Sequence, residues 1–508
     1  MKNQQFERQA AGGRKALPVS YDRTLVRPGI VHIGVGNFHR AHEAFYTNAL
    51  LADESQHDWG ICGVSLLAGD EPVYRALQSQ DGEYTLTVCG RDGHDKIYVI
   101  GSLVELIWAE GNAEAVLGRI ASPNIGIVTM TITEGGYNLD RTTGEFDFES
   151  PGIQHDLEDP ERPVTVFGVL AAALRRRRDM CDKPLTVLSC DNLQHNGDTA
   201  KKAFTAFIER QDPSLASWVE YNVSFPNSMV DRITPRVTED DKKRLNLASG
   251  IEDAAPVYCE DFIQWVIEDD FRAGRPAWEK VGVTFTDDVS AYEKMKLSLL
   301  NASHSMLAYP AFLAGYRQVV EAMNDERFVR YLREFMDEDM SPLVPAPECV
   351  DLELYKKTLL ERFANRAVGD QLARLCLDGA SKIPVYIMPR LAEMIENGAP
   401  LARVAYLFAA YRRYLTERSD ELGHAYEIEE PCLTASDVEL LQQDDPLAFL
   451  KLSPFGGVNL ADSPEFVAAY LRQVQAIRDW GVLGALERVL DGNDDEHHPL
   501  ESAPSTRA

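Results

Sequence analysis

A short apolar run that breaks into a glycine turn constrains the fold more than any other feature of the chain. Residues 29–33 fit a buried strand, and Gly34 and Gly36 follow before a helical pattern begins. Gly34 permits a tight turn, and Gly36 lets backbone amides approach a pyrophosphate at a helix N-terminus. His39 occupies the third position of the usual fingerprint, so these residues alone leave nucleotide binding and a plain structural turn as equal alternatives.

Strand-like and helical patterns alternate along the first part of the chain. Apolar runs occur at 60–67, 96–100, 125–132 and 185–190, and helical patterns at 113–120, 166–174 and 200–209. Such alternation favours a mostly parallel sheet with helices on both faces. From Tyr292 onward the segments read as helical, so we expect an α/β domain over residues 1–285 and an all-α domain over 286–508. The acidic tail from about residue 492 is expected to be frayed.

The charge balance excludes several classes of partner. The 508 residues include 51 basic and 80 acidic side chains, which gives a net charge of −29. Nucleic acids and anionic membrane surfaces would be repelled. The basic run Arg175–Arg178 follows an apolar helical pattern and is predicted to be a solvated helix end. The eight cysteines form no C-x-x-C pair, and no apolar stretch reaches the length of a membrane span, so we expect a cytoplasmic protein.

One apolar helical segment carries three polar groups suited to alcohol–carbonyl chemistry. On a helix through residues 292–309, Lys296, Asn301 and His304 fall on one side. Removing a hydride from a carbinol carbon requires loss of the hydroxyl proton, and a lysine accepts it if its pKa falls from about 10.4 toward about 7–8. An amide donates to the developing oxyanion without titrating, and a histidine donates to a neighbouring hydroxyl. A surface lysine and a satisfied core histidine are the alternative of equal weight.

Positions at the ends of the expected strands add further candidates. Asn192 follows the run at 185–190 and is predicted to be a second oxyanion donor or a cap of the helix near Ala200. Asp70 or Glu71 is the acid expected to bind the adenosine ribose, which favours NAD over NADP. The chain has no H-E-x-x-H motif, paired-cysteine array or G-x-S-x-G elbow, so neither a metal site nor serine hydrolase chemistry is predicted.

Ordered sequence blocks carry a resemblance to a known family. The segment from Lys296 to His304 reads K-x-x-x-x-N-x-x-H, and the glycine turn reads G-x-G-x-F-H-R-A-H. Further blocks are T-I-T-E-G-G-Y at 131–137, S-C-D-N at 189–192, M-V-D-R-I-T-P at 229–235, G-R-P-A-W-E-K-V-G-V at 274–283, D-G-A-S-K-I-P at 378–384 and S-P-E-F-V-A-A at 463–469. From about residue 29 to 481, the chain resembles the polyol-specific long-chain dehydrogenase/reductase family, in which His39 is a normal residue of the turn.

The resemblance implies a fold and a set of residue roles. The first domain would be an expanded Rossmann-type dinucleotide-binding domain and the second a helical domain like that of 6-phosphogluconate dehydrogenase, with the site in the cleft between them. Lys296 would be the general base in oxidation and the general acid in reduction. The other implied site residues are Asn192 and Asn301 in the oxyanion pocket, His304, Arg374, Lys382 and Asp231 around the substrate, Glu293 as a proton relay, and Gly34, Gly36, Asn37, Phe38, Asp70, Thr133 and Glu134 at the cofactor.

The resemblance also implies a reaction. It is the NAD-dependent interconversion of D-mannitol and D-fructose without a metal, since Lys296 takes the role that a metal-bound group has elsewhere. Fructuronate (mannonate) reductase and D-arabinitol 4-dehydrogenase activities are alternatives, although the blocks at 131–137 and 463–469 favour mannitol. Ala68 and Gly69 stand where related enzymes often place an extra acid, so NADP is an alternative cofactor. A non-enzymatic NAD-binding sensor is the remaining alternative. The expected partner is a small polyol or ketose, and the expected state a monomer or weak homo-oligomer.

Overall fold

The computed structural model describes residues 16–140, 143–347 and 350–492, which form two compact units. The first unit runs to Lys296 and includes Ala346–Asp351 and Asn365–Gly369. The second unit consists of Leu297–Pro345, Leu352–Ala364 and the chain from Asp370 onward. Within the described ranges, all named strands belong to the first unit.

A six-stranded sheet forms the centre of the first unit. Its strands, in spatial order, are β5 (Leu103–Trp108), β2 (Gly60–Ser65), β1 (Pro28–Ile33), β6 (Ile127–Met130), β7 (Leu185–Ser189) and β8 (Val223–Ser224). Every neighbouring pair is parallel. This arrangement confirms the predicted parallel sheet of Rossmann type. It also brings the carboxyl ends of all six strands to one edge, where ligands bind in open α/β sheets.

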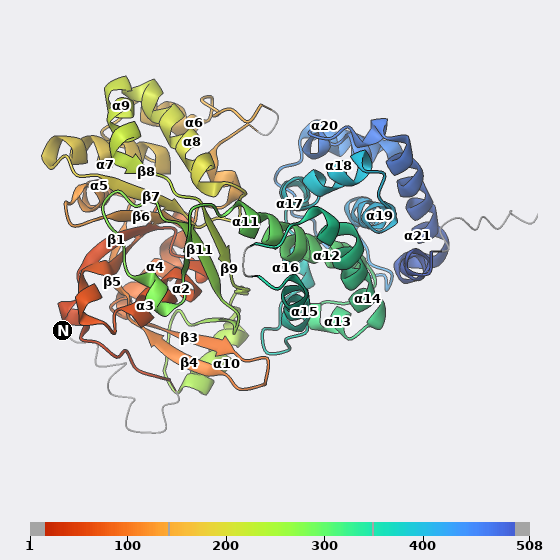
Figure 1. The fold of residues 1–508 in the computed structure, drawn as a ribbon, viewed down its shortest axis with the longest axis horizontal. Coiled ribbons are helices and arrows are strands. Elements are labelled where there is room, and N and C mark those ends of the chain that lie inside the picture. Colours follow the sequence, from red (N-terminus) through yellow and green to blue (C-terminus); the bar gives the residue numbers. More distant parts are fainter. Residues whose placement is uncertain (1–15, 141–142, 348–349, 493–508) are drawn as a thin grey trace, which may run out of the picture. The chain divides into compact units, whose positions relative to one another are not determined.

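Helices cover both faces of this sheet (Figure 1). A hydrophobic core lies on each face of the sheet, and successive side chains of β1 point into opposite cores. Val31 and Ile33 pack in one core and Ile30 in the other. The first face is covered by α5 (Ala113–Ala121), α6 (Pro151–Glu158), α7 (Val166–Met180), α8 (Asn196–Gln211) and α9 (Pro213–Asn222). The second face is covered by α2 (Asn37–Ala41), α3 (Glu43–Leu50) and α4 (Glu71–Ser79).

Two small sheets, which the alternating pattern did not predict, complete the first unit. One has the order β10 (Val257–Glu260), β3 (Tyr84–Cys89), β4 (Lys96–Ile100), and the other β12 (Thr284–Thr286), β11 (Gln264–Glu268), β9 (Ser228–Asp231). The run at 96–100 is therefore a strand as expected, but it pairs antiparallel with β3, outside the main sheet. Helix α10 (Glu239–Ser249) belongs to the same unit, and α11 (Ser290–Lys296) is its last helix.

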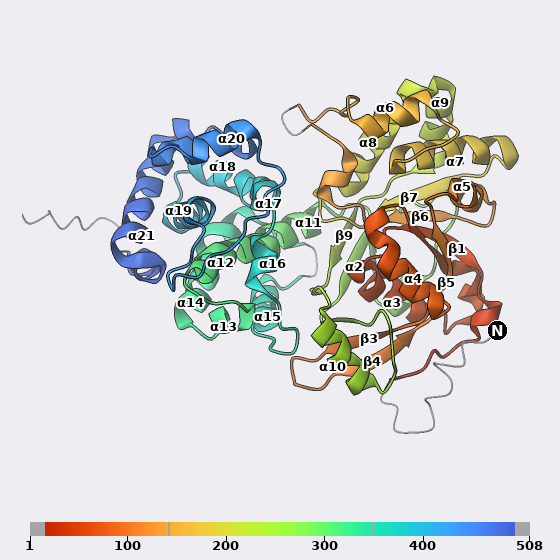
Figure 2. The ribbon, with the colours of Figure 1, turned by 180° about the vertical axis from the view of Figure 1, so that it is seen from behind.

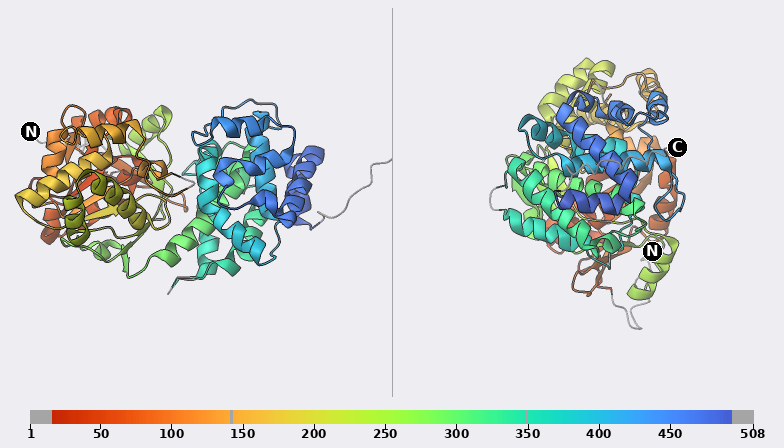
Figure 3. Two further views of the ribbon diagram at one scale, coloured as in Figure 1. Left: turned by 90° about the horizontal axis from the view of Figure 1, so that it is seen from above. Right: turned by 90° about the vertical axis from the view of Figure 1, so that its right-hand side faces the viewer.

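The second unit is helical, as the sequence pattern indicated (Figures 2 and 3). Its α-helices are α12 (Ala302–Leu313), α13 (Val319–Met323), α14 (Glu326–Glu334), α15 (Leu352–Phe363), α16 (Leu372–Cys376), α17 (Gly379–Tyr386), α18 (Met388–Glu396), α19 (Ala402–Glu417), α20 (Ala435–Leu441) and α21 (Pro464–Leu490). Helix α12 packs against α16 and α19, and α19 packs along α21. These contacts confirm the fold class of a Rossmann-type domain followed by a mainly α-helical one.

The segment from Tyr292 to Tyr309 is helical but not uniformly α-helical. A π-helical turn, η7 (Leu297–Asn301), lies between α11 and α12. A helical wheel drawn at 100° per residue therefore misplaces Asn301 and His304 relative to Lys296, because a π turn holds more residues than an α turn. Interruptions of this kind are frequent at functional sites.

The prediction that Arg175–Arg178 form a solvated helix end was wrong for one of the four residues. Arg177, within the run expected to be a solvated helix end, is only 1 % exposed. Its guanidinium donates to five backbone carbonyls, those of Ile120, Ser122, Ile125, Lys183 and Pro184, at 2.8–3.0 Å. A buried arginine is accommodated when its donors find acceptors in this way.

Two other expectations concern the chain as a whole. The tail predicted to fray falls almost entirely on residues 493–508, which lie outside the described part of the structure. Among the residues that the structure describes, none of the helices is both long and apolar enough to cross a bilayer.

Candidate active site

The two glycines of the turn after β1 play different structural roles. Gly34 has φ 97°, and a Cβ atom there would lie 2.3 Å from the carbonyl oxygen of Thr131. Its own carbonyl accepts hydrogen bonds from the amide of Gly36 and the hydroxyl of Thr131, both at 2.7 Å. Gly36, at φ −93°, precedes α2, and the nearest atom to an added Cβ is 3.9 Å away. Gly34 is thus required by the backbone, whereas Gly36 keeps space open in front of the helix.

The two residues that follow are anchored in the first unit. The Asn37 amide donates to the Pro235 carbonyl at 3.3 Å and accepts from the Arg40 guanidinium at 2.6 Å. The Phe38 ring stacks on His42 with ring centroids 4.9 Å apart. These contacts fix the start of α2, and with it the direction of the turn.

The predicted ribose-binding acid lies beyond the end of β2. Asp70 closes the short 3-10 helix η4 (Ala68–Asp70), is half-buried, and accepts from the amide of Leu67 at 3.4 Å. Because β1 and β2 are parallel neighbours, Asp70 follows the same sheet edge as the glycine turn. Arg75, the nearest arginine in sequence, pairs with Glu71 at 2.7 Å.

The loop after β6 contains a strained residue. Thr133 has φ 64° and ψ 166°, a backbone region that glycine favours and that costs other residues about 1–3 kcal/mol. Its amide donates to Asp191 at 2.9 Å. The 3-10 helix η5 (Glu134–Tyr137) begins at the next residue, and the side chain of Glu134 lies outside what the structure describes.

The lysine predicted to transfer the proton is buried in the first unit. Lys296 is the last residue of α11 and is 4 % exposed. Its Nζ donates to the Oδ1 atom of Asn192, which follows β7 at the carboxyl edge of the main sheet. The structure therefore brings together the lysine and one of the two predicted amides.

Glu293 precedes Lys296 by three residues on the same helix and is 2 % exposed. Burial raises the pKa of its carboxyl to about 7, against an opposing effect of the His195 amide, while Glu268 adds to the rise and Lys296 lowers it. That amide donates to Oε2 at 3.0 Å. Its Oε1 atom has no hydrogen-bond partner among the described residues. A carboxyl in this state can exchange a proton near neutral pH.

Asp231 occupies the end of β9 and is 2 % exposed. Helix α11 packs against β9. Asp231 thus belongs to the same unit as Lys296, Asn192 and Glu293, on a strand next to the lysine helix.

The remaining predicted residues belong to the second unit. Asn301 ends the π turn, and its Oδ1 atom is buried without a hydrogen-bond partner among the described residues. The His304 ring stacks on Phe363 with ring centroids 4.4 Å apart. Lys382, on α17, donates to the backbone carbonyls of Arg374 and Leu375, both at 3.4 Å.

An aspartate that the sequence analysis missed holds Arg374 in place. Both oxygens of Asp370 accept from the guanidinium, at 2.7 and 2.6 Å. Burial alone would raise the pKa of Asp370, but Arg374 together with His304 keeps it below its ordinary value. The structure thus places Arg374 and His304 beside one buried carboxylate, while Lys382 contacts the backbone of Arg374. The four-residue spacing of Asp370 and Arg374 was the available signal.

Only one group of three metal-capable side chains converges within the described ranges. It comprises His32, His39 and Glu43, which are all buried. The two imidazole rings stack with centroids 3.5 Å apart and planes 20° apart, so their in-plane lone pairs cannot meet at one ion. Since His32 Nδ1 also lies 2.8 Å from the hydroxyl of Thr129, we interpret the group as part of the buried core.

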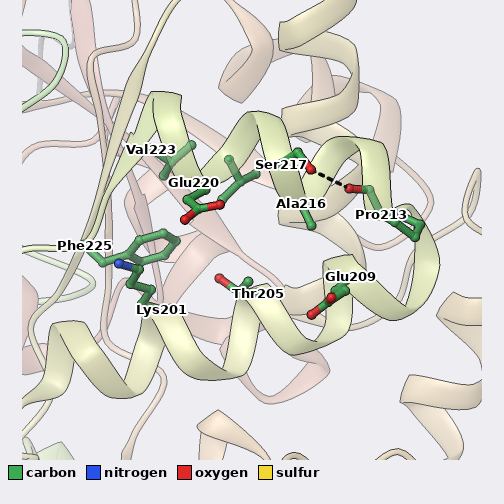
Figure 4. A pocket seen from close by; sticks show the side chains of 10 residues that line it. Lys201, Thr205, Glu209, Pro213, Ala216, Ser217, Glu220, Val223 and Phe225 are labelled. Carbon is green, nitrogen blue, oxygen red and sulfur yellow. Dashed lines mark hydrogen bonds between the residues drawn. The ribbon is translucent and has the colours of Figure 1, made fainter.

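A pocket of about 400 Å³ lies between α8 and α9 (Figure 4). Lys201, Glu209 and Glu220 line it, with Phe225 among the apolar residues. None of the predicted site residues takes part in it. Its lining mixes opposite charges on two surface helices and contains no group with the features found around Lys296.

Comparisons with known proteins agree with the fold. Residues 28–280 match the mannitol dehydrogenase Rossmann domain, and residues 288–478 match the mannitol dehydrogenase C-terminal domain. A polyol:NADP oxidoreductase of Gluconobacter oxydans is 43% identical over 93% of this chain and 98% of its own length. A mannitol 2-dehydrogenase of Phaeosphaeria nodorum is 42% identical over 90% of this chain and 80% of its own.

Solved structures extend the comparison. The Pseudomonas fluorescens mannitol 2-dehydrogenase, in a ternary complex with NAD and D-mannitol, has a TM-score of 0.89 at 45% identity and covers 94% of this chain and 97% of its own. A substrate-free D-sorbitol dehydrogenase has a TM-score of 0.82 at 42% identity, over 93% and 97% of the two chains. The fold and site define a two-domain protein with a Rossmann-type sheet and a helical second unit. Within that class, the chain belongs to the mannitol dehydrogenase family.

Proposed function

We propose that the protein is a polyol dehydrogenase that interconverts D-mannitol and D-fructose with NAD. The observation that carries the proposal is the buried amine of Lys296, which contacts the amide oxygen of Asn192 at the carboxyl edge of the sheet. The mannitol 2-dehydrogenases among its relatives, one of them solved with NAD and D-mannitol, support the choice of substrate.

The chemistry assigned to Lys296 is proton transfer. In the oxidation, the carbinol carbon loses a hydride and the hydroxyl loses a proton, so that a ketone, a reduced cofactor and one proton result. NAD, when bound, supplies the hydride acceptor. We assign the neutral amine of Lys296 to take the hydroxyl proton. In the reduction, the ammonium returns the proton to the new alkoxide.

We assign two side-chain amides, those of Asn192 and Asn301, to the reacting oxygen. Because Asn192 accepts the Lys296 hydrogen bond through Oδ1, its NH₂ group is left to donate elsewhere. We assign that group, with the amide of Asn301, to the developing oxyanion. Such donors stabilise negative charge without titrating, so they act in both reaction directions.

Glu293 is assigned to carry the proton between Lys296 and solvent. It lies one helical turn before the lysine, and its pKa of about 7 allows the carboxyl to be protonated and deprotonated near neutral pH. The backbone amide of His195 keeps the carboxyl oriented.

The substrate hydroxyls are assigned to His304, Arg374 and Lys382 of the second unit and to Asp231 of the first. Arg374 is held by the bidentate bond to Asp370, which leaves a fixed guanidinium plane. Donors of this kind suit the hydroxyls of a linear polyol.

We propose that the protein acts as a monomer or weak homo-oligomer.

The cofactor is assigned to the turn at Gly34 and Gly36, with Asn37, Phe38, Asp70, Thr133 and Glu134 around it. The space in front of Gly36 and the open helix start fit a pyrophosphate. We assign Asp70 to accept from ribose hydroxyls, where it would repel a 2′-phosphate, which favours NAD. The relative named a polyol:NADP oxidoreductase makes NADP the alternative to test.

A substrate panel tests the activity. We expect D-mannitol with NAD to give the highest kcat/KM, followed by D-fructose with NADH in the reverse reaction. D-arabinitol, D-sorbitol and fructuronate, each with either cofactor, are the comparison substrates. A higher kcat/KM for arabinitol or fructuronate would assign the protein to one of the alternative activities. Cofactor binding without turnover of any substrate would support the sensor.

The proposal includes catalysis without a metal. Incubation with a chelator followed by its removal should leave kcat unchanged, since the proton acceptor is an amine. Loss of activity that zinc restores would overturn this part of the proposal.

A further inference from the structure

The strained backbone of Thr133 must be held by its surroundings. A threonine, which is branched at Cβ, does not adopt φ 64° and ψ 166° by preference. The residues around it therefore supply the free energy that keeps this conformation. Strain of this kind concentrates where a loop is positioned for a ligand.

Asp191 is the group that holds the loop. Its Oδ1 accepts from the amide of Thr133 at 2.9 Å, and its Oδ2 accepts from the amide of Ile132 at 3.2 Å. The hydroxyl of Tyr137, at the far end of η5, donates to the same Oδ2 at 2.7 Å. The carboxylate is 7 % exposed, so these bonds compete little with water.

The backbone of Asp191 is fixed as well. Its carbonyl accepts from the Asn196 amide at 3.1 Å, and the same NH₂ group lies within 3.2 Å of the Ser189 carbonyl. The next residue in the chain is Asn192, whose Oδ1 accepts from Lys296. One short segment after β7 thus reaches the loop after β6 through one side chain and the buried lysine through the next.

We propose that Asp191 is a positioning residue that sets the strained loop at Thr133 and the amide of Asn192 at the same time. The inference rests on the proposed function, in which the loop meets the cofactor and Asn192 meets the reacting oxygen. Loss of the carboxylate would relax the loop and free the segment that carries Asn192. Cofactor affinity and turnover would therefore change together.

The test is Asp191→Asn, which keeps the size of the side chain and one acceptor oxygen. Its NH₂ group would face a donor, the amide of Ile132 or Thr133, so the two-point hold on the loop is lost. We expect the Kd for NAD, measured by quenching of protein fluorescence, to rise at least about fivefold. We expect kcat with D-mannitol to fall at least about tenfold, because the amide near the lysine is displaced.

Asp156→Asn is the matched control. Asp156, at 0 % exposure on α6, also accepts from two consecutive backbone amides, those of Val164 and Thr165, both at 2.8 Å, and from the Thr165 hydroxyl at 2.6 Å. It has no part in the proposed site. Its loss should lower Tm as the Asp191 variant does, while the Kd for NAD and kcat stay within about twofold of wild type.

Two outcomes overturn the inference. If Asp191→Asn lowers Tm but leaves both the Kd and kcat within about twofold, Asp191 is only structural, as Asp156 is. If the Asp191 variant does not fold, Tyr137→Phe replaces it, because it removes one donor to Oδ2 and keeps the ring. That variant should weaken NAD binding by about two- to fivefold, and an unchanged Kd would overturn the proposal.

The design separates this inference from the proposed function. A wild-type protein that binds neither NAD nor NADP overturns both. A wild-type protein that binds NAD and oxidises D-mannitol, beside an Asp191→Asn variant that equals it, overturns the positioning role alone.

Discussion

Lys296 lies beside the amide of Asn192 and interacts with the carboxyl of Glu293. The amide oxygen of Asn192 accepts a hydrogen bond from the amine, and the lysine is 4 % exposed. Glu293, one turn earlier, has its own pKa raised by burial to about 7. The role proposed for Lys296, that of proton acceptor, is tested by replacing the amine.

Replacement of this amine should stop proton transfer and spare cofactor binding. We expect Lys296→Ala to lower kcat for D-mannitol oxidation by at least about 10³-fold, since the group assigned to take the hydroxyl proton is removed. The Kd for NAD, from fluorescence titration, should stay within about threefold of wild type. Lys294→Ala is the control, because Lys294 lies on the same helix with its side chain partly exposed. A loss of less than about tenfold in kcat for Lys296→Ala would refute the assigned role.

Glu293 should be visible in the pH profile. As a relay in the oxidation it must be ionised to accept a proton, so kcat should rise with pH through the pKa of about 7. In Glu293→Gln the side chain keeps its shape and cannot titrate. We expect this limb of the kcat profile to disappear and kcat at about pH 8 to fall at least about tenfold. A variant that keeps the same limb would assign that ionisation to another group.

At the scale of elements, the turn between β1 and α2 offers a matched pair of substitutions. Gly34→Ala places a Cβ 2.3 Å from the Thr131 carbonyl at φ 97°, which should lower the free energy of unfolding by at least about 2 kcal/mol. Gly36→Ala meets no atom closer than 3.9 Å and has an ordinary φ, so its Tm should stay near that of wild type. Its methyl group enters the space assigned to the pyrophosphate, and the Kd for NAD should rise about tenfold or more.

Thermal melts and NAD titrations of both variants test these two expectations. If Gly36→Ala binds NAD as wild type does, the cofactor lies elsewhere. If Gly34→Ala keeps its Tm, the turn adapts more easily than its close contact with Thr131 indicates.

Sequence periodicity was sufficient for elements that pack locally. The parallel strands are short apolar runs with helices between them, and the turn at Gly34 has a backbone reason that a sequence can reveal. Sequence periodicity did not predict β3 as the partner of β4, because the pairing of Leu86 with Tyr98 depends on a register that no local pattern encodes. The π turn after Lys296 was missed for the same reason, since its residues fit an α-helix equally well.

The site was predictable in its residue types and less so in its contacts. A helical wheel put Lys296 near Asn301 and His304, while the hydrogen bond that the structure shows joins Lys296 to Asn192, which is distant in sequence. Asp370 was missed because an aspartate four residues before an arginine usually marks an exposed pair. Such contacts depend on where the fold brings separate segments, which composition and spacing do not determine.

For the molecule as a whole, histidines and glutamates with shifted pKa values have opposite effects on how the free energy of unfolding depends on pH. Burial lowers the pKa of His39 to about 4 and that of His42 to about 3, so the unfolded chain binds more protons there below about pH 6.5. Their stabilisation is present above that pH and is lost as the pH falls. Burial raises the pKa of Glu293 and Glu430 to about 7, so these carboxyls stabilise at low pH and lose that effect as the pH rises through 7.

Glu430 gives a direct test of this balance. Its carboxyl accepts from the amides of Gly379 and Ala380 and from the Tyr411 hydroxyl, each at 2.9 Å. Between about pH 5 and 6.5 the folded protein holds nearly one proton more at this site than the unfolded chain, which gives a slope of about −1 kcal/mol per pH unit. Glu430→Gln removes that contribution. The free energy of unfolding from urea titrations should therefore rise with pH about 1 kcal/mol per unit more steeply than in wild type.

Glu429→Gln serves as the control, because Glu429 is the neighbouring residue and its side chain is exposed. The difference between the Glu430 variant and wild type should therefore grow in favour of the variant as pH rises from about 5 to 7, while the control runs parallel to wild type. A difference independent of pH would mean that Glu430 is already ionised in the folded protein at about pH 5. In that case the bonds from Gly379, Ala380 and Tyr411 would outweigh burial, and Glu430 would act as a charged cap of α17.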